Sequence, residues 1–228
     1  MRRFAISDIH GSYYEMMALF EYASFSPTKD QLVVIGDMID RGPESGLVLK
    51  KLRNLEQAYK NVHVTTGNHE EMMVWYLDNK SPMWSMYGGI EASKQINETF
   101  KEEGTSSIIE WVRNLSLTFE DDKFVYAHAG IDKTYGKKTQ NRDILWIKEE
   151  KFYELDNKKL LTYTKNKPVI HGHTPTNSLV FDGMRLNIDL GAQVETNSKL
   201  ALVELEEMIG YVYNFSTKKM EKQSIERK

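Results

Sequence analysis

Five short blocks hold five of the six histidines of this 228-residue chain, and only His63 lies outside them. The same blocks contain aspartates, an asparagine and an arginine, and each block includes glycine. They are residues 8–11 (DIHG), 36–42 (GDMIDRG), 67–70 (GNHE), 128–130 (HAG) and 171–174 (HGHT). Oxygen and imidazole ligands without thiolates suit Mn, Fe or Zn, so the blocks predict a site for such ions.

Short apolar runs rich in valine and isoleucine come before the blocks. Such runs, closed by glycine or aspartate, are typical of buried strands, and functional residues usually lie where these strands end. Helical spacing separates the first three runs, which predicts a βαβαβ order in the N-terminal third. The predicted strands are residues 4–6, 32–35, 62–66, 124–127 and 169–170.

The rest of the chain predicts a change of architecture. From about residue 71 to 116 helical spacing replaces strand signals, which predicts a helical excursion. After Pro168, short strands and turns predict an antiparallel meander. A parallel half followed by an antiparallel half favours an α+β fold, a four-layer α/β/β/α sandwich with two mixed sheets. We expect one domain over residues 1–215 and a flexible polar tail over 216–228.

Composition excludes several classes of function. Thirty Lys and Arg against 33 Asp and Glu give a net charge of −3, so there is no broad basic field for a nucleic-acid backbone. The absence of cysteine excludes disulfides and thiolate metal sites and fits a reducing compartment. No signal peptide or apolar stretch of roughly 18 to 20 residues is recognised. We expect a cytoplasmic protein with neither nucleic-acid nor membrane partners. Its oligomeric state is not predicted.

The first two blocks offer ligands for adjacent ions. Asp8 and His10 stand two residues apart at a strand end, so an oxygen and a nitrogen can face one ion. Asp37 follows the next strand, and its two carboxylate oxygens could reach two ions. A capping aspartate and an incidental surface histidine would explain any one of these residues on its own.

The next residues offer groups that handle phosphate and protons. Arg41 carries a guanidinium fork that suits two phosphate oxygens, and Asp40 could orient a neighbouring imidazole, although a surface ion pair would also explain this pair. Asn68 adds an amide ligand. His69 points differently and suits a proton donor more than a second ligand. Glu70 is expected to be structural.

His128 and His173 end two later apolar runs, and each stands close to a glycine that lets backbone and metal approach closely. A single histidine of this kind is usually structural. Five such coincidences, each at the end of a predicted strand, favour a shared metal site instead.

Together the blocks resemble those of the phosphoprotein phosphatase (serine/threonine protein phosphatase) branch of the calcineurin-like metallophosphoesterase superfamily, and small bacterial and phage members above all. The resemblance runs from Phe4 to about Leu205 and takes in residues 145–147 and 188–192. It implies the metallo-dependent phosphatase fold and two divalent ions, with Mn expected and Fe or Zn as alternatives. The implied ligands are Asp8, His10 and Asp37 for one ion, and Asp37, Asn68, His128 and His173 for the other.

The resemblance also implies roles in catalysis. Arg41 clamps the phosphate, and His69, steadied by Asp40, is the general acid in a direct in-line attack by water activated between the ions. His171 lies beside the ligands without binding. Two positions depart from the family pattern. Lys148 stands where relatives usually have a phosphate-binding arginine, and Tyr87 stands where they tend to have asparagine before a glycine pair.

These features predict a dimetal phosphomonoesterase, with a serine/threonine protein phosphatase as the main hypothesis and a phosphorylated protein or small phosphoester as substrate. A symmetrical dinucleoside tetraphosphate hydrolase is the alternative, because both reactions need the same metal and acid groups. A metal-binding adaptor without catalysis is a third hypothesis. The presence of Asp40, Arg41 and His69, which bind no metal in this interpretation, argues against it.

Three aromatic residues of the helical excursion leave one question open. Trp75, Trp84 and Tyr87 could stack on a nucleobase, which would favour a nucleotide substrate. Aromatic residues at helical spacing are, however, more often part of a core.

Overall fold

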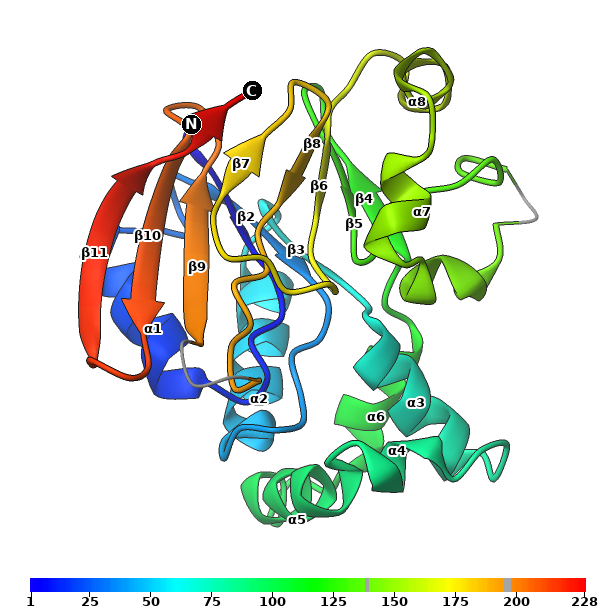
Figure 1. Cartoon of the computed structure of the whole chain (residues 1–228). Helices are drawn as coiled ribbons and strands as arrows, with labels where there is room; N and C mark the ends of the chain where they lie inside the picture. Colours follow the sequence, from blue (N-terminus) through cyan, green and yellow to red (C-terminus); the bar gives the residue numbers. More distant parts are fainter. Residues whose placement is uncertain (138–139, 195–197) are drawn as a thin grey trace.

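The computed structural model describes residues 1–137, 140–194 and 198–228, and its strands form two six-stranded sheets (Figure 1). The strands are β1 Arg3–Ile6, β2 Gln31–Ile35, β3 Val62–Thr65, β4 Thr118–Glu120, β5 Val125–Ala127, β6 Val169–His171, β7 Val180–Phe181, β8 Arg185–Asn187, β9 Lys199–Glu204, β10 Ile209–Asn214, β11 Lys219–Ser224 and β12 Glu226–Arg227. The helices are α1 Tyr13–Tyr22, α2 Ser45–Ala58, α3 Asn68–Leu77, α4 Met83–Met86, α5 Gly89–Thr99, α6 Ser106–Arg113, the 3-10 helix η1 Arg142–Trp146, α7 Glu149–Tyr153 and α8 Asn157–Thr164.

Both sheets are mixed. The first has the order β11-β10-β9-β1-β2-β3, and the second has the order β12-β7-β8-β6-β5-β4. In the first sheet β1, β2 and β3 are parallel. On the other side of β1, β9 pairs with β1, β10 with β9 and β11 with β10, and each of these pairs is antiparallel. In the second sheet β5, β6 and β8 are parallel. The predicted βαβαβ start and the α+β sandwich of two mixed sheets are confirmed.

Alternating side chains along the strands build separate cores on the two faces of each sheet. Phe4 and Ile6 of β1 belong to the core that includes residues of α1 and α2, whereas Ala5 faces the core between the sheets. Successive strand residues point to opposite faces, so one buried strand serves two cores. A third core joins the second sheet to α7 and α8 through Phe152 and Leu160. These cores separate the four predicted layers.

The C-terminal half differs from the prediction in two respects. The meander expected after Pro168 is divided, because β6 to β8 lie in the second sheet and β9 to β11 extend the first. The prediction of a flexible tail over 216–228 is wrong, since β11 pairs with β10 along its length and β12 pairs with β7. The side chains of β11 are almost all exposed. A polar strand of this kind has no apolar alternation, and its order comes from backbone hydrogen bonds to a neighbour.

The predicted helical excursion forms α3 to α6, which lie together at one end of the sandwich (Figure 1). The helix α3 begins at Asn68, directly after the turn that follows β3, so Asn68 and His69 stand in a first helical turn. Among the described residues, no helix has both the length and the apolar character needed to cross a membrane.

Candidate active site

The loops after β1 and β2 stay paired beyond the ends of the strands. The backbone N–H of Asp8 donates to the carbonyl of Gly36 at 3.2 Å, and that of His10 donates to the carbonyl of Asp37 at 3.0 Å. Glycine is needed at Gly42, because a Cβ there would lie 2.2 Å from the carbonyl oxygen of His10. The first two blocks are therefore held against each other by backbone contacts.

Six of the ten predicted site residues adopt a positive φ, which non-glycine residues rarely do. They are Asp8, His10, Asp37, Asp40, Arg41 and His173. Such strain costs about 1–3 kcal/mol per residue and persists only where surrounding contacts fix it. Glu70 provides such contacts, since its buried carboxylate accepts the backbone N–H groups of Asp37, Met38 and Gly67, each at 2.8 Å. The structural role predicted for Glu70 agrees with these bonds.

Asp37 lies between two groups of potential metal donors. Its Oδ2 is 3.8 Å from Nε2 of His10 and 3.9 Å from Nε2 of His69, while its Oδ1 is 3.4 Å from Nε2 of His128. The donor atoms of His10, Asp37 and His69 lie within 4.8 Å of one another, as do those of Asp37, His128 and His173. A carboxylate whose two oxygens face different imidazoles is the arrangement that a bridge between two ions needs.

In His10 and His128, a contact with a backbone carbonyl determines which ring nitrogen remains available to bind a metal. Nδ1 of His10 lies 2.9 Å from the carbonyl oxygen of Ile39, and Nδ1 of His128 lies 3.0 Å from that of Ile35. An N–H donated to these carbonyls leaves the lone pair of each ring on Nε2, the nitrogen that lies near Asp37. Metal-binding histidines usually show this arrangement, so the residues present fit divalent ions.

Asn68 and Asp8 complete the set of predicted ligands. The Oδ1 of Asn68 lies 2.9 Å from both Nε2 of His128 and Nδ1 of His173, so an amide oxygen and two imidazoles converge. Asp8 is buried and belongs to neither donor group. Its Oδ2 accepts hydrogen bonds from the hydroxyl of Ser7 and from the backbone N–H of His173. Asp8 therefore joins the loop after β1 to the loop after β6.

A chain of hydrogen bonds runs from His69 to α4. Nδ1 of His69 lies 2.5 Å from Oδ2 of Asp40, and the indole N–H of Trp84 donates to both Asp40 oxygens at 2.9 and 3.1 Å. Nε2 of His69 lies 3.3 Å from a guanidinium nitrogen of Arg41, whose other terminal nitrogen is 2.6 Å from Nε2 of His10. Asp40 thus fixes the Nδ1 side of the His69 ring, and Arg41 lies beside the Nε2 atoms of both imidazoles.

Trp84 has a role that the sequence interpretation missed. Its spacing fits a core residue, and the side chain is indeed only 2% exposed. A buried indole N–H nevertheless requires an acceptor, and this requirement is the signal that could have linked Trp84 to a carboxylate.

Burial and carboxylates shift the pKa values of the histidines in different directions. Burial lowers the pKa of His173 to about 4 and so favours the neutral ring that donates a lone pair. For His69, Asp37 and Asp40 outweigh burial and raise the pKa, so this ring retains a proton more readily. Burial also opposes protonation of His128, but Asp37 raises its pKa to about 10. Asp37 and Asp40 thus favour positive charge among the histidines of the site, and bound divalent cations would supply such charge.

Lys148 stands apart from the other nine predicted residues. It precedes α7, its side chain is exposed, and its ammonium forms no ion pair with any residue that the structure describes. The neighbouring Glu149 accepts a hydrogen bond from the amide of Asn187, which also donates to the carbonyl of Thr174, the residue after His173. Lys148 therefore lies at the edge that carries the site, without a contact to the donor groups.

Two further buried groups lie close to the site. His171, which precedes the His173 loop, places Nε2 3.3 Å from the hydroxyl of Tyr153 on α7 and its ring against Phe152. Burial and the charge of Asp8 raise the pKa of Asp189 well above its usual value, and this carboxyl accepts the backbone N–H of Gly191. In this structure His171 connects the loop to α7.

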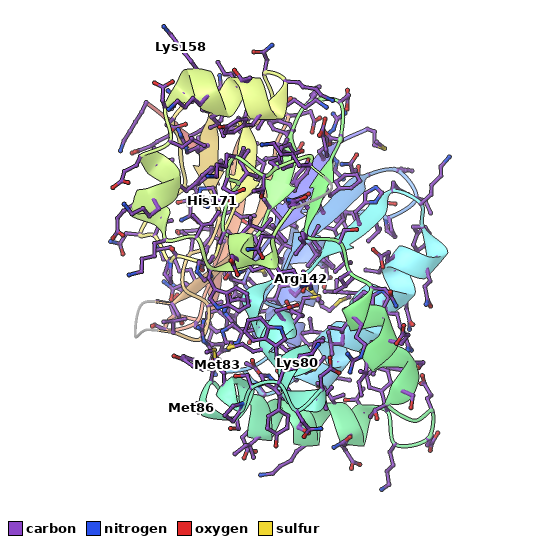
Figure 2. All side chains as sticks on the ribbon, turned by 90° about the vertical axis from the view of Figure 1, so that its right-hand side faces the viewer. Lys80, Met83, Met86, Arg142, Lys158 and His171 are labelled. Atoms are coloured by element: carbon purple, nitrogen blue, oxygen red, sulfur yellow. The ribbon has the colours of Figure 1, made fainter. Side chains whose placement is uncertain are left out.

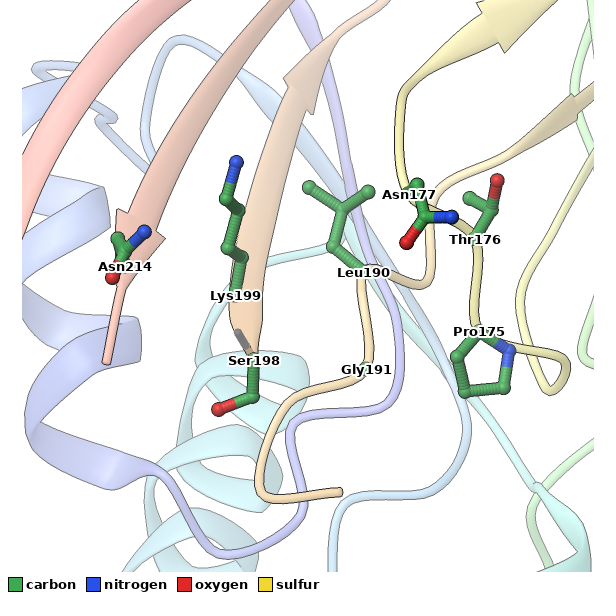
Figure 3. Close-up of a pocket in the computed structure, with 8 residues that line it drawn as sticks. All are labelled: Pro175, Thr176, Asn177, Leu190, Gly191, Ser198, Lys199 and Asn214. Atoms are coloured by element: carbon green, nitrogen blue, oxygen red, sulfur yellow. The ribbon is translucent and has the colours of Figure 1, made fainter. Parts of the chain in front are cut away.

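A polar cavity of about 540 Å³ adjoins the loop that follows His173 (Figure 3). Pro175 to Asn177 form one wall, and Lys199 and Asn214, from β9 and β10, form the other. None of the predicted site residues lines this cavity. The cavity and the groups of potential metal donors are therefore separate.

Comparisons with known proteins indicate a phosphoesterase. The symmetrical bis(5'-nucleosyl)-tetraphosphatase of Photorhabdus laumondii is 34% identical over 144 residues, which cover 61% of this chain and 48% of that protein. The corresponding enzyme of Erwinia tasmaniensis is 32% identical over 136 residues, or 58% of this chain and 45% of that protein. The chain thus spans about half the length of the curated relatives it matches.

A solved structure shares the fold at low sequence identity. The cold-active protein-tyrosine phosphatase of a psychrophilic Shewanella superposes with a TM-score of 0.68 at 18% identity, covering 97% of this chain and 80% of that one. A family model described as calcineurin-like phosphoesterase matches residues 1–192. The family predicted from the motifs is therefore confirmed, and the chain belongs to the calcineurin-like phosphoesterases.

Proposed function

We propose that this chain is a metal-dependent hydrolase of dinucleoside tetraphosphates that cleaves them symmetrically. The observation that carries the hydrolytic chemistry is the position of Asp37, whose two oxygens face separate groups of imidazoles. The named activity of the curated relatives favours a dinucleotide substrate over a phosphoprotein. This preference reverses the order of the two hypotheses drawn from the sequence.

In this proposal the ions are held by the six predicted ligands. Mn is the metal that the family resemblance leads us to expect, and the oxygen and nitrogen donors suit Fe or Zn as well. Two bound divalent ions supply Lewis acidity that activates a water and neutralises charge on the phosphate oxygens. The proposed ligands are Asp8, His10, Asp37, Asn68, His128 and His173.

The chain's own groups then position the phosphate and move a proton. Arg41 holds oxygens of the attacked phosphate, and the exposed ammonium of Lys148 adds a second positive charge from the position just before α7. His69, oriented through Nδ1 by Asp40, donates the Nε2 proton to the bridging oxygen as its bond to phosphorus breaks. Water adds to the attacked phosphorus, so one dinucleoside tetraphosphate yields two nucleoside diphosphates.

Side-by-side turnover of diadenosine tetraphosphate and a phosphoserine peptide tests this proposal. With Mn added to the full chain, we expect kcat/KM for the dinucleotide to exceed that for the peptide by about tenfold or more, with ADP as the nucleotide product. Release of ATP and AMP would contradict symmetrical cleavage. Preference for the peptide would instead support the protein phosphatase hypothesis.

A further inference from the structure

The structure places the three aromatic residues of the helical excursion in different environments. Trp75 stacks on Trp146 of η1, with ring centroids 5.0 Å apart and planes 13° apart. Trp84 is buried against Asp40. Tyr87, in contrast, is 53% exposed. Of the three rings that could meet a nucleobase, Tyr87 is thus the one whose face is free.

The backbone beside Tyr87 is fixed against the proposed phosphate-binding turn. Gly88 has a φ of +104°, and a Cβ at this position would lie 3.2 Å from the backbone nitrogen of Arg41 and 3.3 Å from Cβ of Asp40. On its other side, the N–H of Tyr87 donates to the carbonyl of Trp84 at 3.1 Å. The exposed ring therefore projects from a backbone held next to Asp40 and Arg41.

His69 indicates which end of a substrate lies near this segment. A general acid must lie beside the leaving group, because it protonates the oxygen that departs. His69 is bound to Asp40, and Asp40 is bound to Trp84 of α4. The segment from α4 to Tyr87 therefore lies on the same side of the site as His69, the proposed general acid.

We propose that Tyr87 stacks on the base of the departing nucleotide and so contributes to substrate selection. This inference rests on the proposed function. A nucleoside diphosphate combines charged phosphates, which suit Arg41 and the ions, with a flat apolar base, which suits an exposed aromatic ring. Two methionines of α4, Met83 and Met86, are also exposed, and Figure 2 shows them close together toward the lower end of the molecule. Thioethers of this kind adapt to flat aromatic ligands.

Product inhibition measures contact with the nucleoside separately from contact with the phosphates. ADP carries a nucleoside and inorganic pyrophosphate does not, so the ratio of their inhibition constants against p-nitrophenyl phosphate reports on the base and ribose, and the change of that ratio in a ring-deleting variant reports on stacking. In Tyr87→Ala, the inhibition constant of ADP should rise about fivefold or more relative to that of pyrophosphate, because stacking is lost. Tyr87→Phe keeps the ring and should retain the wild-type ratio. A change in the ratio of less than about twofold in Tyr87→Ala overturns the inference.

Two further variants separate a specific effect from a general one. Tyr14→Ala removes a tyrosine that is 62% exposed on α1 and should leave the ratio unchanged. Asn177→Ala alters the cavity of Figure 3. If Asn177→Ala raises the ADP constant and Tyr87→Ala does not, the base binds in that cavity and the inference is wrong. Failure of the wild-type chain to cleave diadenosine tetraphosphate would overturn the proposed function, whereas the inhibition ratio still reports on Tyr87.

Discussion

At the scale of single residues, the site depends on carboxylates held in backbone conformations that cost energy. Asp37 and Asp40 both have positive φ, and each binds an imidazole whose other contacts are fixed. Their oxygens are consequently directed before any ligand arrives, so little reorganisation is needed on binding. Substitutions that keep the size of these side chains but change their charge should affect chemistry more than folding.

Asp37→Asn should remove most of the bound metal and most of the activity. The substitution replaces one of the two oxygens by an amide nitrogen and removes the negative charge, so the side chain can no longer join two cations. Metal analysis and turnover of the purified variant test this expectation, with circular dichroism as the control for folding. Two ions per chain together with near-normal turnover would show that Asp37 is not a bridge.

His69→Asn should lower turnover by about 10² to 10⁴-fold, the range for loss of acid–base assistance, while the metal content stays intact. The defect should be smaller with p-nitrophenyl phosphate, whose leaving group needs no proton. His69 also lies in one of the two donor groups around Asp37. Loss of metal in this variant, or equal losses on alkyl and nitrophenyl phosphates, would therefore identify a ligand instead of an acid.

At the scale of elements, α4 connects the helical excursion to the proton donor. This four-residue helix is too short to be stable by itself. It is held by the indole of Trp84, which donates to Asp40 and also contacts the ring of Tyr76 from α3. Changes in α4 should therefore reach the active site through the indole of Trp84.

Trp84→Phe should move the alkaline limb of the kcat profile to higher pH. Burial raises the pKa of Asp40, and the Trp84 hydrogen bond opposes this effect by stabilising the carboxylate. Without the bond, the ionised carboxylate of Asp40 attracts the His69 imidazolium more strongly, so the pKa of His69 rises. A general acid then keeps its proton to higher pH.

The matched control is Trp111→Phe, which removes an indole hydrogen bond from α6 to Glu56 of α2. Its pH profile should equal that of the wild type. An alkaline limb that does not move in Trp84→Phe would show that α4 does not influence the pKa of His69.

At the scale of the whole molecule, Asp121 ties the two sheets together. Its side chain accepts hydrogen bonds from Arg3 of β1 and Gln31 of β2 in the first sheet. It also accepts the hydroxyl of Tyr126 from β5 in the second sheet. Burial would raise the pKa of this carboxyl, but its hydrogen bonds outweigh burial and lower the pKa. The ionised form therefore stabilises the fold.

Asp121→Asn should lower the free energy of unfolding at pH 7 by about 1.5–3 kcal/mol, the range for hydrogen bonds to a charged group. Because the folded pKa lies below the unfolded one, this stabilisation is present above the unfolded value of about 4 and is lost as pH falls through the folded value. Urea unfolding of both proteins at pH 7 and at acidic pH measures it. A difference between them that stays constant down to about pH 3 would contradict the assignment.

The sequence by itself determined what depends on local chemistry and local spacing. Apolar runs and helical periods predicted the βαβαβ start and the helical excursion that follows it. They could do so because the residues that face a core recur every two positions in a strand and about every 3.6 positions in a helix. The blocks predicted the family and indicated a metal-binding edge, because they combine donor types with glycines that permit close approach. Asp37, for example, is identifiable from the glycine and the strand that precede it.

The tertiary structure decided everything that depends on which distant segments meet. Residues 219–224 are polar, and they are ordered because β10 supplies backbone partners. Trp84 and Tyr87 belong to the same short segment, yet one is buried on Asp40 and the other is exposed, which only the packing against the Asp40–Arg41 turn determines. Periodicity records whether a residue has an apolar neighbourhood, whereas the partner of a hydrogen bond depends on long-range contacts that no local pattern contains.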